Sequence, residues 1–237
     1  MDLELSEDQV ALRDGTHALL DGRFPIERVR AGFDRAMWDE LAGAGVLSLL
    51  ADGFAAADAV VVLEQLGGAL VPGPFVDGIV ANGVDGGAGI VAIVERPKPY
   101  ESLVIEHLDA IDALLVLDDA GAWRVDAREV EHDVSPWPLD PLTPVSWATA
   151  IPEGEAFAGT DVVAQWRQLG AVFTAAYLLG MAQRLTDMSV AYAKGRQQFD
   201  RPIGSFQAMK HMLADMVVST EVARAAVYAA GAHLADP

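Results

Sequence analysis

The sequence contains no cysteine. Disulfide bonds, thiolate catalysis and thiolate metal ligands are therefore excluded. Basic residues are scarce as well, because 16 Lys and Arg stand against 35 Asp and Glu and give a formal net charge of −19. A surface of that charge repels phosphate backbones and anionic bilayers, so we expect neither nucleic acid nor a membrane as a partner. An anionic small ligand would need a local group of cations.

Long apolar runs are also missing. Hydrophobic residues make up 52% of the chain, enough for a buried core, but uninterrupted runs such as 59–63 and 113–117 are short. A transmembrane helix needs roughly 20 such residues. The first residues, 1–5, are acidic and lack the basic segment that begins a signal peptide. These absences together predict a cytoplasmic globular protein.

Several common functional motifs are absent or out of order. The chain has no Gly-x-Ser-x-Gly sequence, and its acidic pairs are expected to be solvated. The glycine-rich stretch 83–89 precedes a predicted strand, whereas a phosphate loop follows one, so we interpret it as a flexible connector. Scattered histidines without metal-ligand spacing are expected to be surface or packing residues. They are His17, His107, His132, His211 and His233.

The pattern of predicted elements changes twice along the chain and indicates an α+β fold that is mostly helical. Residues 1–78 are predicted to form an amino-terminal helical domain, 79–159 a small β domain, and 160–237 a carboxy-terminal domain of two long helices. The first helix begins after a capping box of Ser6 and Gln9, runs through Leu20 and is broken by Phe24-Pro25. Further helices are expected over 37–46, ending in glycines, and over 58–70.

The middle region has the short apolar runs and turns of a small sheet of five to six strands. Strands are predicted over 89–94, 113–118 and 123–127, the last two forming a hairpin, and a final strand over 145–151. Four prolines within 135–144 predict an extended, irregular segment.

Two long helices are predicted after the β region, from Thr160 or Asp161 to Phe199 and from Ser205, as the N-cap, to 235. Apolar residues recur on each at spacings of three and four, which places a core stripe on each helix. The stripes are Leu178, Met181, Leu185 and Met188, and Met209, Leu213, Met216 and Val217. Two antiparallel helices would leave much of this surface open, so other helices, from this chain or from a partner, are expected to cover it.

The stretch 192–211 joins the two long helices. It holds Arg196 and Arg201, two of the few cations, close to aromatic and amide side chains. Such a corner could hold a flat, anionic ligand. It could equally be a polar junction, with Arg196 bonded to the last-turn carbonyls and Gln207 on a first helical turn.

The spacing within this stretch resembles the acyl-CoA dehydrogenase family, whose carboxy-terminal domain carries the pattern Arg-x-x-Phe-Gly-x-Pro-Ile-x-x-x-Gln-x-x-x-x-x-Leu-Ala-Asp-Met. The corresponding residues here are Arg196, Phe199, Pro202, Ile203, Gln207, Leu213, Ala214, Asp215 and Met216. Asp200 replaces the usual Gly. Weaker similarity covers 38–47, 62–67 and 72–75, and the α–β–α order also matches.

The resemblance implies that the chain handles FAD and an acyl-CoA thioester, with an electron-transfer flavoprotein as acceptor. In the family the Arg and Gln of this motif reach across a dimer interface to the FAD of the neighbouring subunit. Arg196, Phe199 and Gln207 are therefore expected to be cofactor contacts given to a partner. That partner would be a second acyl-CoA dehydrogenase-like subunit or another copy of this chain.

The departures from the family pattern bear on catalysis. The nearest equivalent of the flavin-cradling Thr-Glu-Pro-x-x-Gly-Ser segment is 94–97, without Gly-Ser. No Glu lies between Glu155 and Glu221, so the long helix supplies no catalytic Glu, and neither Asp161 nor Asp187 is marked as a base. The catalytic residue is unknown.

Three hypotheses follow from these departures. The first is a shortened subunit of a heteromeric dehydrogenase, of the kind that degrades bulky CoA thioesters such as steroid side chains. The second is a homomeric dehydrogenase that continues beyond Pro237, and the third is a non-catalytic helical scaffold.

Overall fold

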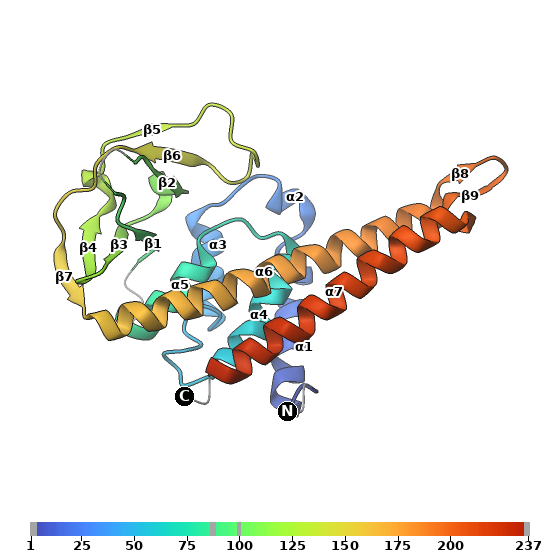
Figure 1. Cartoon of the computed structure of the whole chain (residues 1–237), viewed down its shortest axis with the longest axis horizontal. Helices are drawn as coiled ribbons and strands as arrows, with labels where there is room; N and C mark the ends of the chain where they lie inside the picture. The colour runs from blue at the N-terminus through green and yellow to red at the C-terminus, as the bar shows by residue number, and fades with distance from the viewer. Residues whose placement is uncertain (1–3, 86–88, 99–100, 235–237) are drawn as a thin grey trace. The chain divides into compact units, whose positions relative to one another are not determined.

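The computed structural model describes residues 4–85, 89–98 and 101–234 (Figure 1). They fold as two compact units, each assembled from segments that are distant in sequence. One unit comprises Met1–Phe24, Ala56–Leu70 and Val172–Pro237, and the other Pro25–Ala55 and Val71–Ala171. The predicted fold class, mostly helical α+β, is confirmed. The division into three domains at 78/79 and 159/160 stays a prediction.

The first unit is helical. Its elements are α1 (Glu7–Arg23), α4 (Ala56–Ala69), most of α6 (Thr160–Gly195) and α7 (Gln207–Leu234). The predicted capping box is present, since the Ser6 hydroxyl accepts from the Gln9 N–H and the Gln9 side chain accepts from the Ser6 N–H. The α1 helix extends three residues past the predicted Leu20, and Phe24 then caps it before Pro25.

Helices α4 and α6 approach each other closely through two glycines. A Cβ atom on Gly67 would lie 1.9 Å from the Tyr177 carbonyl oxygen, and one on Gly180 would lie 1.9 Å from the Glu64 carbonyl oxygen. No side chain fits at either position. The crossing of these helices therefore depends on glycine from both partners.

The second unit contains α2 (Ile26–Val29), α3 (Arg35–Gly43) and α5 (Phe75–Asp85), together with two sheets. As the glycines predicted, α3 ends in a Schellman motif, in which the Gly45 N–H donates to Ala42 and the Val46 N–H to Leu41. Gly45 takes the left-handed conformation that this motif requires, with φ of +80°. Helix α5 was not expected, because most of its residues were assigned to the β region.

The first sheet has the order β1-β3-β4-β7 and the second the order β2-β6-β5. Their strands are β1 (Val91–Glu95), β2 (Leu103–Glu106), β3 (Ala113–Asp118), β4 (Gly121–Asp126), β5 (His132–Val134), β6 (Val145–Ala148) and β7 (Glu155–Ala158), with short 3-10 helices at η1 (Leu108–Ala110) and η2 (Ala127–Glu129). The predicted hairpin is confirmed, since β3 and β4 pair antiparallel. The strands β2, β5 and β7 were not predicted, because each is only three or four residues long, and β2 and β7 also pair with strands distant in sequence.

Two predictions about the glycine-rich and long-helix regions need correction. Gly83 to Asp85 lie in α5, while 86–88 of the predicted connector fall outside the described residues, as do residues 1–3 and 235. Helix α6 ends at Gly195 rather than Phe199, because the chain turns there into a short ribbon. Across the described ranges, no helix combines the length and apolarity of a membrane span.

Candidate functional site

The corner between the long helices is a two-stranded ribbon, β8 (Gln197–Gln198) and β9 (Arg201–Pro202), followed by η3 (Ile203–Ser205). Figure 1 shows it at the end of α6 and α7 that lies away from α4. Gln198 pairs with Arg201, so the loop has only two residues, Phe199 and Asp200. Both take positive φ angles, +53° and +61°, as a two-residue hairpin turn of this type requires.

The turn geometry of the ribbon explains why Asp200 can replace the Gly of the family motif. Asp200 stands where the motif has Gly, and its φ of +61° lies in the left-handed region that glycine adopts freely. Aspartate tolerates this region better than most residues. The turn is therefore kept despite the substitution. The prediction that Ser205 caps α7 is wrong, because α7 begins at Gln207 and the Phe206 carbonyl accepts its first helical bond, from the Lys210 N–H.

Arg196 follows directly on α6, with its backbone fixed at both ends. Its N–H donates to Tyr192 at 2.8 Å, and its carbonyl accepts from Ile203 at 2.8 Å. The side chain is exposed, and over the described ranges its guanidinium makes no hydrogen bond or ion pair. The polar-junction alternative, in which this side chain caps the last-turn carbonyls, is thus not what the structure shows.

The aromatic side chains of the ribbon form a small cluster with one cation. The Phe199 ring is 85% exposed and meets Phe206 edge to face, with centroids 6.1 Å apart. The Arg201 guanidinium lies over the other ring, with its carbon 4.1 Å from the Phe206 centroid. Phe206 therefore touches both an exposed aromatic ring and an exposed cation.

Gln207 lies on the first turn of α7, as the polar-junction alternative also expected. Its amide nitrogen lies 2.9 Å from the Nε2 atom of His211, one turn further along the helix. Both side chains are exposed. Gln207 lies at the ribbon end of the helix pair because it is the first residue of α7.

The end of the helix pair is also a concentration of positive charge. Residues 194–211 contain four of the 16 basic residues and one acidic residue, a net charge of +3 in a chain of net −19. All five charged side chains are exposed. They are Lys194, Arg196, Asp200, Arg201 and Lys210. Of these groups, the two guanidinium groups, together with the aromatic rings, suit a flat ligand that carries phosphate groups.

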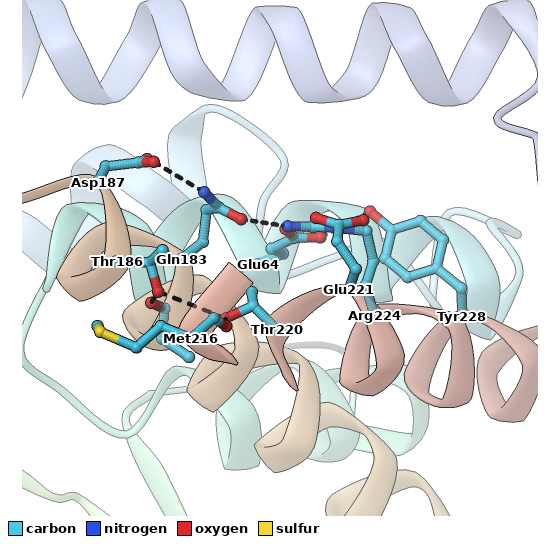
Figure 2. Close-up of polar contacts among 10 residues, drawn as sticks. Glu64, Gln183, Thr186, Asp187, Met216, Thr220, Glu221, Arg224 and Tyr228 are labelled. Carbon is cyan, nitrogen blue, oxygen red and sulfur yellow. Dashed lines mark hydrogen bonds and ion pairs between the residues drawn. The ribbon is translucent and has the colours of Figure 1, made fainter. Parts of the chain in front are cut away.

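A second polar cluster, which was not predicted, lies inside the first unit (Figure 2). Glu64 on α4 is buried and forms an ion pair with the Arg224 guanidinium on α7. The Tyr228 hydroxyl donates to the same carboxylate at 2.7 Å. Arg224 also donates to the Gln183 amide oxygen on α6 at 2.7 Å, so the cluster links three helices. A sequence signal existed, since Glu64 is the one charged residue within 59–76.

The pKa shifts in this cluster are those expected of a buried ion pair whose two members bond each other. Burial and the adjacent Glu64 carboxylate raise the pKa of Tyr228 well above its ordinary value, so the phenol stays protonated. Burial alone would lower the pKa of Arg224, but the Glu64 carboxylate outweighs it and raises that pKa. A depression of about 410 Å³ opens beside the cluster and is lined in part by Arg13 and Gln65. Because the charged groups there bond one another, we assign the cluster to helix packing.

The two predicted apolar stripes differ in burial. On α6, Leu178, Leu185 and Met188 are each more than half exposed. On α7, Val217 is exposed at 44%, whereas Met209, Leu213 and Met216 are partly covered. The α6 stripe is therefore not a core of this chain, which agrees with the expectation that the helix pair alone leaves it open.

The two acidic residues of α6, Asp161 and Asp187, do not have the surroundings of a catalytic base. Asp187 is exposed and accepts a hydrogen bond from the Gln183 amide at 2.9 Å, and Asp161 lies exposed in the first turn. For neither residue does the structure show a neighbouring group that would make it a base.

Comparison with known proteins decides the family. The chain is 32% identical to the acyl-CoA dehydrogenase IpdE2 of Mycolicibacterium smegmatis over 253 residues, which cover 94% of this chain and 76% of that protein. This chain belongs to the acyl-CoA dehydrogenase family. The family model for the acyl-CoA dehydrogenase C-terminal domain matches residues 158–236, which include the ribbon.

Solved structures show that the similarity to acyl-CoA dehydrogenases extends to the whole fold. The ChsE4–ChsE5 complex of Mycobacterium tuberculosis contains a chain that matches all of this one and is itself 80% covered, with a TM-score of 0.80 at 24% identity. A variant of the Tcur3481–Tcur3483 steroid acyl-CoA dehydrogenase matches 94% of this chain and is 77% covered, with a TM-score of 0.80 at 22% identity. At these identities the match is one of fold.

Proposed function

We propose that this chain is a subunit of a heteromeric acyl-CoA dehydrogenase and that its ribbon contributes contacts to an FAD bound mainly by a partner subunit. The observation that carries the proposal is the exposure of the three motif residues, Arg196 and Phe199 at the ribbon and Gln207 on the first turn of α7 that follows it. These are the three motif residues expected to contact the cofactor. Because the side chains of Arg196 and Phe199 are exposed, they are available to contact a ligand that is bound mainly by another subunit.

The chemistry of the ribbon fits FAD. A guanidinium can bond pyrophosphate oxygens in pairs, an exposed phenylalanine can pack on a flat ring, and an amide can both donate and accept. Arg196 would hold the phosphates, while Phe199 and Gln207 would contact the planar parts. One of the solved structures with this fold is an FAD-dependent dehydrogenase, with a TM-score of 0.76. When bound, the flavin would supply hydride acceptance during α,β-dehydrogenation of an acyl-CoA thioester.

Two observations support a partner subunit. The α6 stripe, with Leu178 and Leu185 more than half exposed, offers an apolar surface that another helix could cover. Two structures with this fold carry the names of two proteins each, ChsE4–ChsE5 and Tcur3481–Tcur3483. Because the latter is named a steroid acyl-CoA dehydrogenase, we propose a bulky, steroid-derived acyl group as substrate.

The partner would also supply the catalytic base. Removal of the α-proton needs a carboxylate close to the thioester. Helix α6 contains no Glu, and its Asp187 is engaged by Gln183. We therefore assign to this chain cofactor contacts and the subunit interface rather than proton abstraction.

The test is flavin content with and without the partner. The chain is purified alone and after co-expression with an acyl-CoA dehydrogenase-like subunit encoded by a neighbouring gene, and the visible flavin absorbance of each preparation is measured. We expect flavin only in the co-purified complex. We expect Arg196→Ala to weaken FAD binding to the complex by about tenfold or more, as loss of a charge-assisted contact predicts.

Each other outcome contradicts the proposal in a different way. Stoichiometric FAD in the chain alone would support a homomeric dehydrogenase. No flavin in either preparation, with Arg196→Ala without effect, would leave a scaffold. The matched control is Arg184→Ala, which removes an exposed cation from α6 outside the ribbon and should leave the FAD affinity unchanged.

A further inference from the structure

The aromatic ring of Phe206 occupies the central place in the ribbon, although the family motif assigns it no role. It lies between η3 and α7 and is partly buried. On one side its ring meets the edge of Phe199, at 6.1 Å between centroids and an interplanar angle of 82°. The Arg201 guanidinium lies 4.1 Å from its centroid. One side chain thus touches two of the exposed groups on the ribbon.

The contact with Arg201 restricts a side chain that would otherwise be mobile. Arginine has many rotamers, and ordering them on binding costs affinity. A guanidinium stacked on a ring is already restricted, yet stacking uses only its face and leaves its N–H groups in the plane free to donate. Arg201 is exposed, so these donors reach solvent.

The strand pairing of the ribbon puts Arg196 and Arg201 close to each other along the ladder. Gln198 and Arg201 are direct cross-strand partners, and the hydrogen bond from the Ile203 N–H to the Arg196 carbonyl continues the ladder by one step. Side chains alternate along a strand, so positions 196, 198 and 201 fall on one face of the ribbon. Two cations therefore share a face in a chain with a net charge of −19.

We propose that Arg201 is a second phosphate-binding residue of this site, beside Arg196, and that Phe206 is the positioning residue that holds Arg201 and Phe199 in place. The inference rests on the proposed function, since the phosphates are those of the FAD of the partner subunit. A pyrophosphate carries two phosphoryl groups, so two guanidinium groups on one face match its charge and extent. Phe206 acts through its neighbours and need not touch the ligand.

The first test removes the cation. FAD is titrated into flavin-stripped complex of this chain and its partner, with flavin fluorescence as the readout, at low and high salt. We expect Arg201→Gln to weaken FAD binding by about tenfold and to reduce its salt dependence. Lys210→Gln is the matched control, because Lys210 is an exposed cation at the same end of the helix pair and on α7. It should change the affinity by less than about twofold.

The second test removes the ring. Phe206→Leu keeps an apolar side chain but cannot stack on the guanidinium, so we expect it to weaken FAD binding nearly as much as Arg201→Gln. The double variant should then bind about as well as either single variant, because both changes disable one element. Phe206→Tyr keeps a π face and should restore the affinity. Circular dichroism checks that the variants remain folded, and the tyrosine variant keeps the test valid if leucine does not fold.

The outcomes separate this inference from the proposed function. If Arg196→Ala weakens FAD binding while Arg201→Gln behaves like Lys210→Gln, the role of Arg201 is refuted and the proposed function stands. If Phe206→Leu leaves the affinity unchanged, the positioning role is refuted. If Arg196→Ala has no effect either, the ribbon is no flavin contact and the proposed function fails as well.

Discussion

Glu64 and Arg224 lie 160 positions apart in the sequence and form a buried ion pair between α4 and α7. The Glu64 side chain is 7% exposed and that of Arg224 25%. The Tyr228 hydroxyl also donates to Glu64, and Arg224 also donates to the Gln183 amide oxygen (Figure 2). The two members of the ion pair depend on each other, because a buried charge without its partner is costly.

Loss of the Glu64 charge should destabilise the helical unit. We expect Glu64→Gln to lower the free energy of unfolding by about 3 kcal/mol, the lower end of the range for breaking a buried pair, since Arg224 keeps some access to water. Glu221→Gln is the control, because Glu221 contacts the same guanidinium from an exposed position and should cost under about 0.5 kcal/mol. Urea unfolding of both variants measures the difference. Equal midpoints would contradict the structural role of Glu64.

The crossing of α4 and α6 makes a second prediction, at Gly180. Gly180→Ala would place a methyl group 1.9 Å from the Glu64 carbonyl oxygen, so the helices must separate. We expect a marked fall in thermal stability. Gly170→Ala is a matched control on the same helix, because a methyl group there would have no atom within 4 Å, and alanine should stabilise the helix by about 0.5–1 kcal/mol. Thermal melts that shift the same way for both would refute the close approach.

The turn of the ribbon predicts the effect of changes at Asp200. With φ of +61°, this residue carries a conformational cost that glycine avoids. Asp200→Gly should be neutral or stabilise the ribbon, whereas Asp200→Val should destabilise it by about 1–2 kcal/mol, the cost of a left-handed residue. Hydrogen exchange at the Ile203 amide, which bonds Arg196, reports on the ribbon. Slower exchange in the valine variant would contradict this turn geometry.

Asp77 on α5 gives a prediction for pH. Burial raises its pKa to about 7, although the Ile93 N–H donates to it and opposes the shift, and the Glu106 carboxylate adds to the rise. An unfolded aspartate titrates near 4, so between about pH 4 and 7 the folded state holds the extra proton. The free energy of unfolding should therefore fall as the pH rises through this window, and Asp77→Asn should remove that slope.

Asp112 provides the opposite case for the same measurement. Burial alone would raise its pKa, but Arg35 and the Ile90 N–H bond the carboxylate and lower it overall. Its contribution to stability is thus present above the ordinary aspartate pKa and is lost as the pH falls below it. Unfolding free energies are measured from pH 3 to 8 for the unsubstituted protein, Asp77→Asn and Asp112→Asn. The pH profile of Asp77→Asn should differ from that of the unsubstituted protein toward the neutral end of this range, and that of Asp112→Asn toward the acidic end. A flat profile in the unsubstituted protein between pH 4 and 7 would contradict the assignment for Asp77.

Local sequence patterns determined much of the secondary structure. The capping box at Ser6, the Schellman end of α3 and the hairpin of β3 and β4 involve residues a few positions apart, so the chain specifies them without its tertiary context. The two long helices follow from the spacing of their apolar residues. The motif from Arg196 to Gln207 also indicated the family, which comparison with IpdE2 shows.

Contacts between distant segments decided the rest. Strands β2 and β7 exist because partners far along the chain complete their hydrogen bonds. Strand β5 is only three residues long, and α5 lacks the strong boundary signals of the other helices. The ribbon at Phe199 and Asp200 has no Asn-Gly signal, so only the paired backbone revealed it. Glu64 is conspicuous as the one charged residue within 59–76, but nothing in the sequence identifies Arg224 as its partner, because the fold decides which residues distant in sequence come into contact.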